Sequence, residues 1–442
     1  GGGGECDIEA MLVLDRRVDL VTPMMTPLTY EGLIDEVIGI QNGYIEVDES
    51  LIDPAEEEEN PDATAPNDQP PKPSTKPSTK SREKVALSLN GSDTLYAEVR
   101  NQNVEKFGSF LQDQAKALQE SHSNFTNKEK DLTEIHQFVK QMPVFTQNLR
   151  SLALHIHLAE MVKSTTDESA FRQRWQTERA MVEGELCYDT IEDLIASQEP
   201  PLKLLRLLCL QSLTQGGLKS NKFDSLRREV VQAYGYEYLV ILTQLEKLGL
   251  LRKREMTWGV ESLGSPFATL RKSLNLIHAE VNNMDPDDVS YVSSGYAPLT
   301  ARLVQQTCGT MSGWMGKEEA LKEIPGRLVD VVQQVCGIPP EEFRNAMKKC
   351  GKGGNKHLNS AKGGGGRGLN KLPPASAAAA ATDASGGDAK KKPVLMVYYV
   401  GGVTFMEIAA LRFLSKRASF PYEILVCTTK VVNGNTLLQG LY

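Results

Sequence analysis

The chain lacks the paired cysteines that stabilise small extracellular domains. Its seven cysteines are scattered over 442 residues, and no Cys-x-x-Cys pair occurs. Disulfide frameworks and zinc knuckles need recurrent, closely spaced cysteines, so neither is expected here. Several of the cysteines lie in apolar sequence, which predicts reduced, mostly buried thiols in a cytosolic protein.

Long apolar runs and an excess of positive charge are also missing. A transmembrane helix needs about 18 or more apolar residues, and the nearest candidate, "PLKLLRLLCLQSL" at 201–213, is interrupted by Lys203 and Arg206. That segment predicts a buried amphipathic helix. The formal net charge is −8, whereas nucleic-acid binding needs a basic face. We expect no nucleic-acid partner, and association with membranes through a partner protein.

Motifs for catalysis, cofactors and metals are incomplete. The segment "VYYVGGVTF" at 397–405 joins a predicted strand to a helix, but it lacks the third glycine of a dinucleotide-binding loop. His155 and His157 are two residues apart, which places them on nearly opposite sides of a helix, so they cannot share a metal. We expect no metal and no cofactor, and favour a binding protein over an enzyme. A Rossmann-like nucleotide-binding enzyme is the weaker alternative.

Two segments have compositions that do not support a core. Residues 51–84 are acidic and rich in proline, with a short KPST repeat, and residues 351–392 carry glycine and alanine runs. Both are expected to be disordered loops inserted into a folded protein.

Helical periodicity fills the middle of the chain and predicts a projecting hairpin. Apolar residues recur at helical spacing from Leu95 to Glu120, and again from Leu132 to Ala159. Two such runs, joined by a polar break, predict a long antiparallel pair of helices. Pro143 lies within the second run, where proline removes a backbone hydrogen bond and costs about 3 kcal/mol. We expect a bend there, at which the second helix stops and restarts. The sequence leaves open whether the bend is fixed or a switch.

The two ends of the chain predict one parallel sheet. The apolar runs "PVLMVYYV" (393–400) and "YEILVCTTK" (422–430) flank an amphipathic helix, which is the pattern of a βαβ unit with strands buried on both faces. The apolar residues 11–14 are expected to join the same sheet. The predicted fold class is therefore α/β plus α, a split parallel-sheet domain with a large helical insertion. Three strands are few for such a sheet, so a further α/β portion is expected upstream of Gly1.

The stretch "LDRRVDLVTPMMTPLTYEGLIDE" (14–36) resembles a signature of the Sec/Munc (SM) family, whose members bind SNARE proteins and promote membrane fusion. Four further segments resemble the family in the same order: "QMPVFTQNLRSLALHIHLAE" (141–160), "YGYEYL" (234–239), "SYVSSGYAPL" (290–299) and "VGGVTFMEIAALRFLS" (400–415). "TYEGLIDE" and "SGYAPL" are most similar to the vacuolar protein sorting branch, the SM subunit of the HOPS and CORVET tethering complexes.

The resemblance implies an arch of three domains, of which the first α/β domain is absent from this chain. Residues 1–50 would then begin the split α/β domain and enter the helical insertion. Residues 85–185 would form the SNARE-facing hairpin subdomain, 186–284 a helical subdomain that docks a partner subunit, and 285–442 the return to the α/β domain.

The resemblance also implies a SNARE-binding segment on the hairpin, which carried over to this sequence comprises Met142, Pro143, Phe145, Leu149, Leu152 and Ile156. Four of them, Phe145 onward, form one apolar stripe. The alternative is that this stripe is the core of the hairpin itself.

In the vacuolar branch the region around "RREVVQAYGYEYL" resembles the docking face for the α-solenoid class C subunit. Arg227, Tyr236 and Leu239 are spaced nine and three apart and are expected on roughly one helical face. Aromatic and arginine anchors suit an interface; the alternative for Tyr236 is an ordinary core position.

The opening motif is expected to be a structural corner without catalytic function. Asp15, Arg16 and Asp19 are predicted to form hydrogen bonds where the chain leaves the sheet, and Thr29 to cap the next helix.

The function implied is templating of SNARE assembly. The partners would be Qa- and R-type SNAREs and the class C subunit, on the late endosome or vacuole (lysosome) membrane. The alternative is a purely structural scaffold subunit of the tethering complex.

Overall fold

A computed structural model describes residues 8–48, 84–126, 132–254, 265–309, 317–324 and 392–441. The predicted loops at 51–84 and 351–392 lie outside these residues, except that Lys84 begins a strand and Lys392 precedes one.

The described elements are mostly helices, with strands near the two ends of the chain and a short strand pair between them. In chain order they are β1 (Ile8–Asp15), η1 (Arg16–Val18), α1 (Val21–Met24), α2 (Tyr30–Val37), β2 (Tyr44–Asp48), β3 (Lys84–Ser88), α3 (Thr94–Val99), α4 (Val104–Thr126), α5 (Leu132–Thr166), α6 (Ser169–Glu183), α7 (Tyr188–Ala196), α8 (Pro201–Gln215), α9 (Ser220–Tyr234), α10 (Glu237–Lys247), α11 (Pro266–Ser273), η3 (Val289–Ser293), α12 (Leu299–Cys308), α13 (Glu318–Glu323), β4 (Val394–Val400), α15 (Phe405–Lys416), β5 (Glu423–Thr428) and α16 (Gly434–Gln439).

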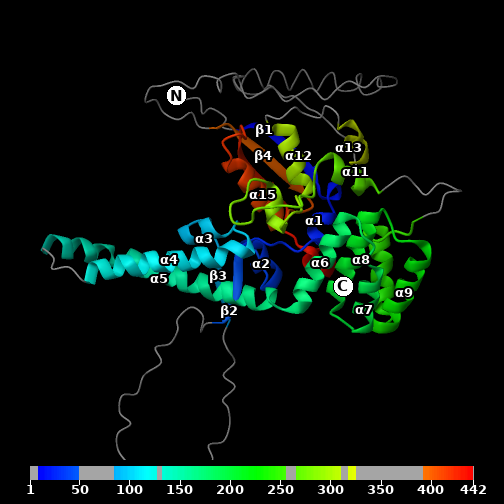
Figure 1. Cartoon of the computed structure of the whole chain (residues 1–442), viewed down its shortest axis with the longest axis horizontal. Coiled ribbons are helices and arrows are strands. Elements are labelled where there is room, and N and C mark those ends of the chain that lie inside the picture. The colour runs from blue at the N-terminus through cyan, green and yellow to red at the C-terminus, as the bar shows by residue number, and fades with distance from the viewer. Residues whose placement is uncertain are drawn as a thin grey trace, which may run out of the picture.

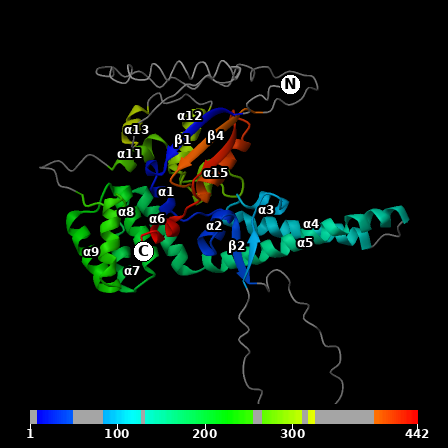
Figure 2. The same cartoon turned by 180° about the vertical axis from the view of Figure 1, so that it is seen from behind.

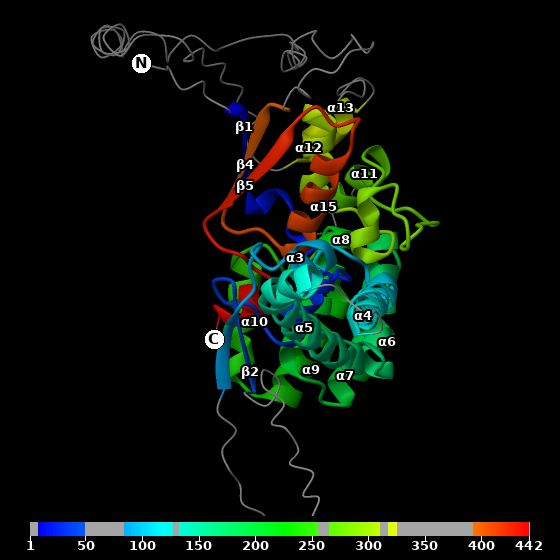
Figure 3. The same ribbon diagram turned by 90° about the vertical axis from the view of Figure 1, so that its left-hand side faces the viewer.

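The two ends of the chain form one parallel sheet, which confirms the prediction of a mixed α/β fold. Its strand order is β1-β4-β5, with Leu12 opposite Val397 and Val397 opposite Val426. Helix α15 connects β4 to β5 and, with α12, covers one face of the sheet (Figure 3). β2 and β3 pair separately as an antiparallel ribbon.

The prediction that these strands are buried on both faces is wrong for the residues described. In β4 the side chains alternate: Leu395, Val397 and Tyr399 are fully buried beneath the helices, whereas Met396 and Tyr398 on the other face are only partly buried. Leu425, opposite Met396 in β5, is 44% exposed. The apolar run is continuous in sequence, but the helices of the described part cover only the face toward α12 and α15.

Two hydrophobic cores organise the rest of the molecule. One is continuous from the sheet through helices α6–α12, and the other joins α2, the β2–β3 ribbon, α3 and the near half of the α4–α5 pair. In Figure 1 the helices α7–α9 lie on one side of the sheet domain, and α4 and α5 extend from the opposite side. The long pair is therefore anchored at one end only.

A buried ion pair joins the start of the chain to its end. The Arg16 guanidinium donates two hydrogen bonds to the Glu407 carboxylate, at 2.7 and 2.8 Å, and its Nε donates to the Asp19 carbonyl at 2.9 Å. Thr300 Oγ1 donates to the same carboxylate at 2.6 Å. Burial alone would raise the pKa of Glu407, but the Arg16 charge and these hydrogen bonds hold that pKa below its usual value.

Asp19, next to this ion pair, connects a third segment of the chain to it. Asp19 accepts hydrogen bonds from the backbone N–H of Thr22 at 2.9 Å and of Leu299 at 3.1 Å. Asp15 accepts from the backbone N–H of Arg17 and begins η1. Three segments, 15–22, 299–300 and 404–407, thus meet at one buried polar cluster, which fixes how the chain leaves the sheet.

The turn after β4 requires glycine. Gly402 has a φ of +111°, and a Cβ on it would lie 2.8 Å from the Val432 side chain. A larger residue would therefore be strained in backbone conformation and would also clash.

The predicted single helix from Leu95 to Glu120 is wrong, because the chain breaks at 100–103. Asp93 caps α3 through the N–H groups of Leu95 and Tyr96. Asn103 then begins a new helix: its side chain accepts from the Glu105 N–H at 3.1 Å and donates to the Tyr291 carbonyl at 2.7 Å. A contact to residue 291, which periodicity does not reveal, sets the helix boundary.

Removing one partner of the buried ion pair should destabilise the protein strongly. Arg16→Ala leaves the Glu407 carboxylate buried without its countercharge, and we expect a loss of about 3–5 kcal/mol in the free energy of unfolding. Urea unfolding followed by circular dichroism measures this loss. Arg17→Ala is the matched control, because the Arg17 side chain is 82% exposed and pairs with exposed Asp15; it should leave the urea midpoint almost unchanged. Equal effects of the two variants would contradict this account.

Candidate functional site

The α4–α5 pair is a long arm that leaves the body of the protein. Figures 1 and 2 show both helices extending to one side, well beyond α2 and the β2–β3 ribbon. Helix α5 has 35 residues, which at 1.5 Å per residue corresponds to a length of about 52 Å. The expected interruption at Pro143 is wrong, since α5 is continuous from Leu132 to Thr166 with Pro143 inside it. Pro143 is exposed, so water can reach the backbone of this turn.

The predicted SNARE-binding stripe is divided by the structure. Leu152 is 6% exposed and Ile156 packs against the second core, so these two residues belong to the base of the arm. Leu149 is 49% exposed and Met142 is 38% exposed, while Phe145 is partly buried. The outer residues are therefore on the surface, as a binding site requires, whereas the inner residues belong to the core.

Val144 is an exposed apolar residue that the sequence reasoning missed. It is 59% exposed on α5, more than any member of the predicted stripe. Its position lies outside the three-four spacing of the stripe, so periodicity gave no reason to select it.

A groove runs beside the arm between α3, α4 and α5. Its cavity is about 230 Å³, and its walls include small side chains: Ala117, Ser121 and Ser151. Leu152 and Asn148 of α5 also line this groove, and Asn148 directly precedes Leu149 in the chain. Small residues allow a second helix to approach closely, so the groove and the exposed Leu149 form one surface suited to a helical guest.

A buried polar cluster locks the base of the arm to α3 and α2. Asp93 accepts hydrogen bonds from Ser151 Oγ at 2.7 Å and pairs with His155 Nε2 at 3.2 Å. The other ring nitrogen of His155 lies 3.0 Å from the Tyr30 hydroxyl. Burial would raise the pKa of Asp93, but the hydrogen bonds from His155 and Ser151 lower it well below its ordinary value. His155 is fully buried and its role is structural.

The residues predicted to dock a partner subunit do not share one helix. Gly235, with a φ of +107°, ends α9, so Arg227 lies on α9 while Tyr236 caps α10 and Leu239 lies within it. Arg227 nevertheless reaches across to Glu246 on α10, at 3.4 Å. The expectation of one helical face is therefore wrong, because the helix break was not recognised.

The docking residues are nonetheless exposed. Tyr236 is 83% exposed, which excludes an ordinary core position within this chain, and Leu239 is 40% exposed. Val240, which the sequence reasoning did not select, is 60% exposed. Together Tyr236, Leu239 and Val240 define an apolar α10 patch.

Thr29 does not cap α2 with its side chain. Its backbone has the extended conformation of a cap residue, but its Oγ1 is buried and has no hydrogen-bond partner among the described residues. The first N–H groups of α2 bond to the chain between α3 and α4 instead: Tyr30 N to Gln102 O at 2.9 Å, and Glu31 N to Arg100 O at 3.0 Å. Backbone carbonyls that are distant in sequence therefore accept the hydrogen bonds that a side-chain cap would accept.

The described residues contain neither a membrane-spanning helix nor a cluster of metal ligands. No helix in this part of the chain is long and apolar enough to cross a membrane. Across the same residues, no cluster of three or more His, Cys, Asp or Glu could hold a metal.

Solved structures of other proteins share this architecture, and one of them is described as an SM protein. The Unc18–syntaxin 1 complex from Monosiga brevicollis matches with a TM-score of 0.56 and 13% identity, over 100% of this chain and 62% of the other. The SM protein Vps45 in complex with the Qa SNARE Tlg2 matches with a TM-score of 0.56 and 16% identity, over 98% and 59% of the two chains. At these low sequence identities the similarity shows a shared fold and nothing further.

A model of the Sec1 family matches residues 7–440, and the chain belongs to this family. It is 34% identical to the vacuolar protein-sorting-associated protein 33 homolog of Arabidopsis thaliana, over 99% of this chain and 62% of that protein. It is 36% identical to the vacuolar protein sorting-associated protein 33A of Rattus norvegicus, over 98% and 61%. The chain thus spans about 61–62% of the length of these relatives.

The contribution of the cluster at the base of the arm to the free energy of unfolding should depend on pH. Because the folded pKa of Asp93 lies below its unfolded value of about 3.9, its contribution to stability is full above that pH and is lost as the pH falls below it. Asp93→Asn keeps a residue able to cap α3 but removes the charge. We expect urea unfolding to show a loss of roughly 1–2 kcal/mol at pH 7, and a difference from wild type that shrinks towards pH 3. Asp113→Asn, on the exposed side of α4, is the control; a difference at Asp93 that does not change with pH would contradict the assignment.

Proposed function

We propose that this chain is part of an SM protein that binds Qa- and R-type SNARE helices and templates their assembly in fusion at the endosome and vacuole (lysosome). Membership of the Sec1 family supports this, as do relatives named for vacuolar protein sorting and a fold neighbour solved with a Qa SNARE. The observation that carries the proposal is the arm itself: a long helical pair with exposed Met142, Val144 and Leu149, and with a groove between α3, α4 and α5.

The proposed mechanism is entropic. SNARE segments that are disordered alone lose conformational entropy when they order against each other. An arm anchored at its base and rigid along α5 holds one helix in register before the second arrives, and this lowers the remaining entropic cost of assembly. No bond needs to form or break, so the protein acts by binding and not as an enzyme.

The α10 patch is proposed to dock the α-solenoid class C subunit of HOPS or CORVET. Tyr236 and Val240 expose large apolar surfaces to solvent. Arg227 on the neighbouring helix forms an ion pair with Glu246 of α10. An aromatic anchor with an arginine beside it is the composition of an interface core. Docking here would place the chain on the late endosome or vacuole membrane through its partners.

The scaffold function is a second candidate. Tyr236 is the most exposed large apolar residue of the described part, and two of the predicted SNARE-binding residues, Leu152 and Ile156, are committed to the core. On this reading the chain joins subunits, and SNARE binding depends on segments beyond it.

The nucleotide-binding alternative is disfavoured by the turn after β4. The buried, negatively charged Glu407 and Thr404 form a capping box that occupies the first turn of α15, where a phosphate would bind. The chain at 430–432 also pairs with Val403 and closes over the turn.

A charged residue on the outer arm should abolish SNARE binding without unfolding the protein. Leu149→Asp places a carboxylate in the proposed contact, and we expect affinity for a soluble R-type SNARE to fall roughly tenfold or more. Titration calorimetry measures the affinity, and circular dichroism checks the fold. Gln147→Asp adds the same charge two residues away, toward another side of α5, and should bind normally. Full-strength binding by Leu149→Asp would refute SNARE binding at this surface.

Substitutions in the α10 patch should abolish binding of the solenoid subunit and leave SNARE binding at the arm unchanged. Tyr236→Asp with Val240→Asp is expected to abolish capture of the class C solenoid subunit in a pull-down, because both side chains would lose their apolar contact area. SNARE affinity should be unchanged, and Lys247→Ala, an exposed change on the same helix, should bind both partners. Capture of the solenoid subunit by the double variant at wild-type level would remove this docking site.

A further inference from the structure

Helix α2 lies at the boundary between the two hydrophobic cores and has two unlike faces. Tyr30, Leu33 and Ile34 belong to the second core, together with the base of the arm. The polar face carries three carboxylates that bond to helices or caps of the first core: Glu31, Asp35 and Glu36. The arm base is therefore joined to the rest of the molecule along α2 by polar contacts.

Two of these contacts are buried at the C-terminal end of α2. Glu36 forms an ion pair with Arg206 of α8, and the two side chains are 6% and 1% exposed. The Asp35 carboxylate accepts a hydrogen bond at 2.7 Å from Asn433, the residue that caps α16. Withdrawing one partner from a buried ion pair is strongly destabilising, so this end of α2 is a fixed point.

The third contact lies at the other end of α2 and is closer to solvent. Arg412 of α15 forms an ion pair with Glu31, and the Arg412 side chain is 26% exposed. The same guanidinium donates to Asn101 Oδ1 at 3.1 Å, in the break between α3 and α4. From α3, the Tyr96 hydroxyl donates to the Glu31 carboxylate at 2.7 Å. Arg412 therefore holds α2, α3 and the α3–α4 connection against the sheet domain, either directly or through Glu31.

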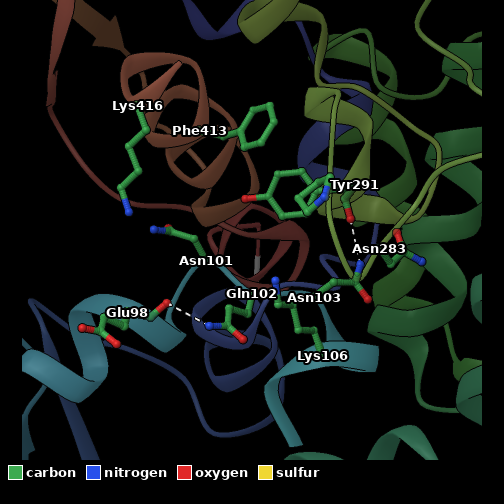
Figure 4. Close-up of a pocket in the computed structure, with 10 residues that line it drawn as sticks. Glu98, Asn101, Gln102, Asn103, Lys106, Asn283, Tyr291, Phe413 and Lys416 are labelled. Atoms are coloured by element: carbon green, nitrogen blue, oxygen red, sulfur yellow. Dashed lines mark hydrogen bonds between the residues drawn. The ribbon is translucent and has the colours of Figure 1, made fainter. Parts of the chain in front are cut away.

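A pocket lies on the same side of α2, where the arm base meets the sheet domain. Its volume is about 150 Å³, and it is lined by residues of α15, of the segment 98–106 and of the segment 283–291 (Figure 4). Asn101, the second partner of Arg412, is one of them. Asn103 also crosses the boundary here, by donating to a backbone carbonyl of 283–291 at 2.7 Å. A few hydrogen bonds beside a cavity, and not a filled apolar core, thus hold the arm base on this side.

We propose that Arg412 is a positioning residue that sets the angle at which the arm leaves the sheet domain. While Arg412 holds Glu31, the arm base is fixed at both ends of α2. When that ion pair is removed, the buried Glu36–Arg206 pair stays in place and the arm base tilts about it.

The angle matters for the proposed function, on which this part of the inference rests. A helix bound at Leu149 is carried by the arm, whereas a second helix meets it at a place fixed by the rest of the protein. The part of α5 between Lys140 and Leu158 is about 27 Å long, so a tilt of about 15° at the base moves its outer end by about 7 Å. Such a displacement leaves the first contact intact but lowers the effective concentration of the second helix.

The first test measures the direction of the arm in the full chain. Spin labels on non-canonical residues at the exposed positions Lys140 and Glu423 give a distance distribution by double electron–electron resonance. Labelling through cysteine is avoided because Cys187 and Cys427 are partly exposed. We expect Arg412→Met, which keeps an apolar stem but removes the ion pair, to broaden the distribution by about 5 Å or more. Arg412→Lys keeps the charge and should retain most of the wild-type width.

Lys416→Met is the matched control, because it makes a similar change at an exposed position one turn farther along α15. Its distance distribution should match that of the wild type. Glu31→Gln tests the other partner: it keeps an acceptor for Tyr96, removes the charge that Arg412 binds, and should broaden the distribution as Arg412→Met does. Circular dichroism and urea midpoints check the fold, and Glu31→Gln decides the question if Arg412→Met does not fold.

The second test follows SNARE binding by fluorescence anisotropy. A labelled soluble R-type SNARE should bind Arg412→Met within about twofold of wild type, because Leu149 is unchanged, whereas recruitment of a Qa-type SNARE to that complex should weaken roughly fivefold or more. Lys416→Met should behave as wild type in both steps.

Wild-type distance distributions in Arg412→Met and Glu31→Gln, or equal broadening in Lys416→Met, would overturn the proposal. Unchanged Qa-type recruitment despite a broadened distribution would also reject Arg412 as a positioning residue. Full-strength R-type SNARE binding by Leu149→Asp would instead count against the proposed function, and the distance measurement would still decide whether Arg412 sets the angle of the arm.

Discussion

Arg16 and Glu407 are 391 residues apart in the chain, yet they share two hydrogen bonds in a site closed to water. A buried charge without its partner is strongly destabilising, so β1 can pair with β4 only when the helical insertion returns the chain to this point. Thr300 and the Leu299 N–H, from the segment that closes the insertion, complete the cluster by bonding to Glu407 and Asp19. The ion pair therefore fixes the sheet and, through it, the direction in which the inserted helices leave.

The arm follows from that anchoring. Its inner half contributes Phe107, Leu111 and Leu158 to the second core, and Asp93 and His155 lock it to α3 and α2. On the outer side of Leu152, toward residue 140, no described side chain of α5 is buried. The same helix thus serves as structure at its base and as free surface farther out. A mutation on one heptad stripe has different consequences at Leu149 and Leu152, although the sequence pattern treats them alike.

The outer arm and the α10 patch are separate surfaces: α9, against which α10 packs, lies on the other side of the molecule from the arm (Figure 2). One suits a helix that lies along a groove, and the other suits an apolar anchor on a broader partner. Because the two surfaces share no residues, occupation of one leaves the other free.

Elements whose signal is local could be predicted from the sequence: the parallel strands at both ends, the paired helices of the arm, the junction from strand to helix after β4, and the family signature that begins at Leu14. It could not determine where helices break, because Asn103 and the N–H groups of α2 are satisfied by carbonyls distant in sequence. It also could not say which half of an apolar stripe is covered, whether Pro143 ends a helix, or that Arg227 and Tyr236 lie on different helices. Burial and hydrogen-bond partners depend on what packs nearby, so these were decided by the tertiary structure, above all by the pairing of Arg16 with Glu407.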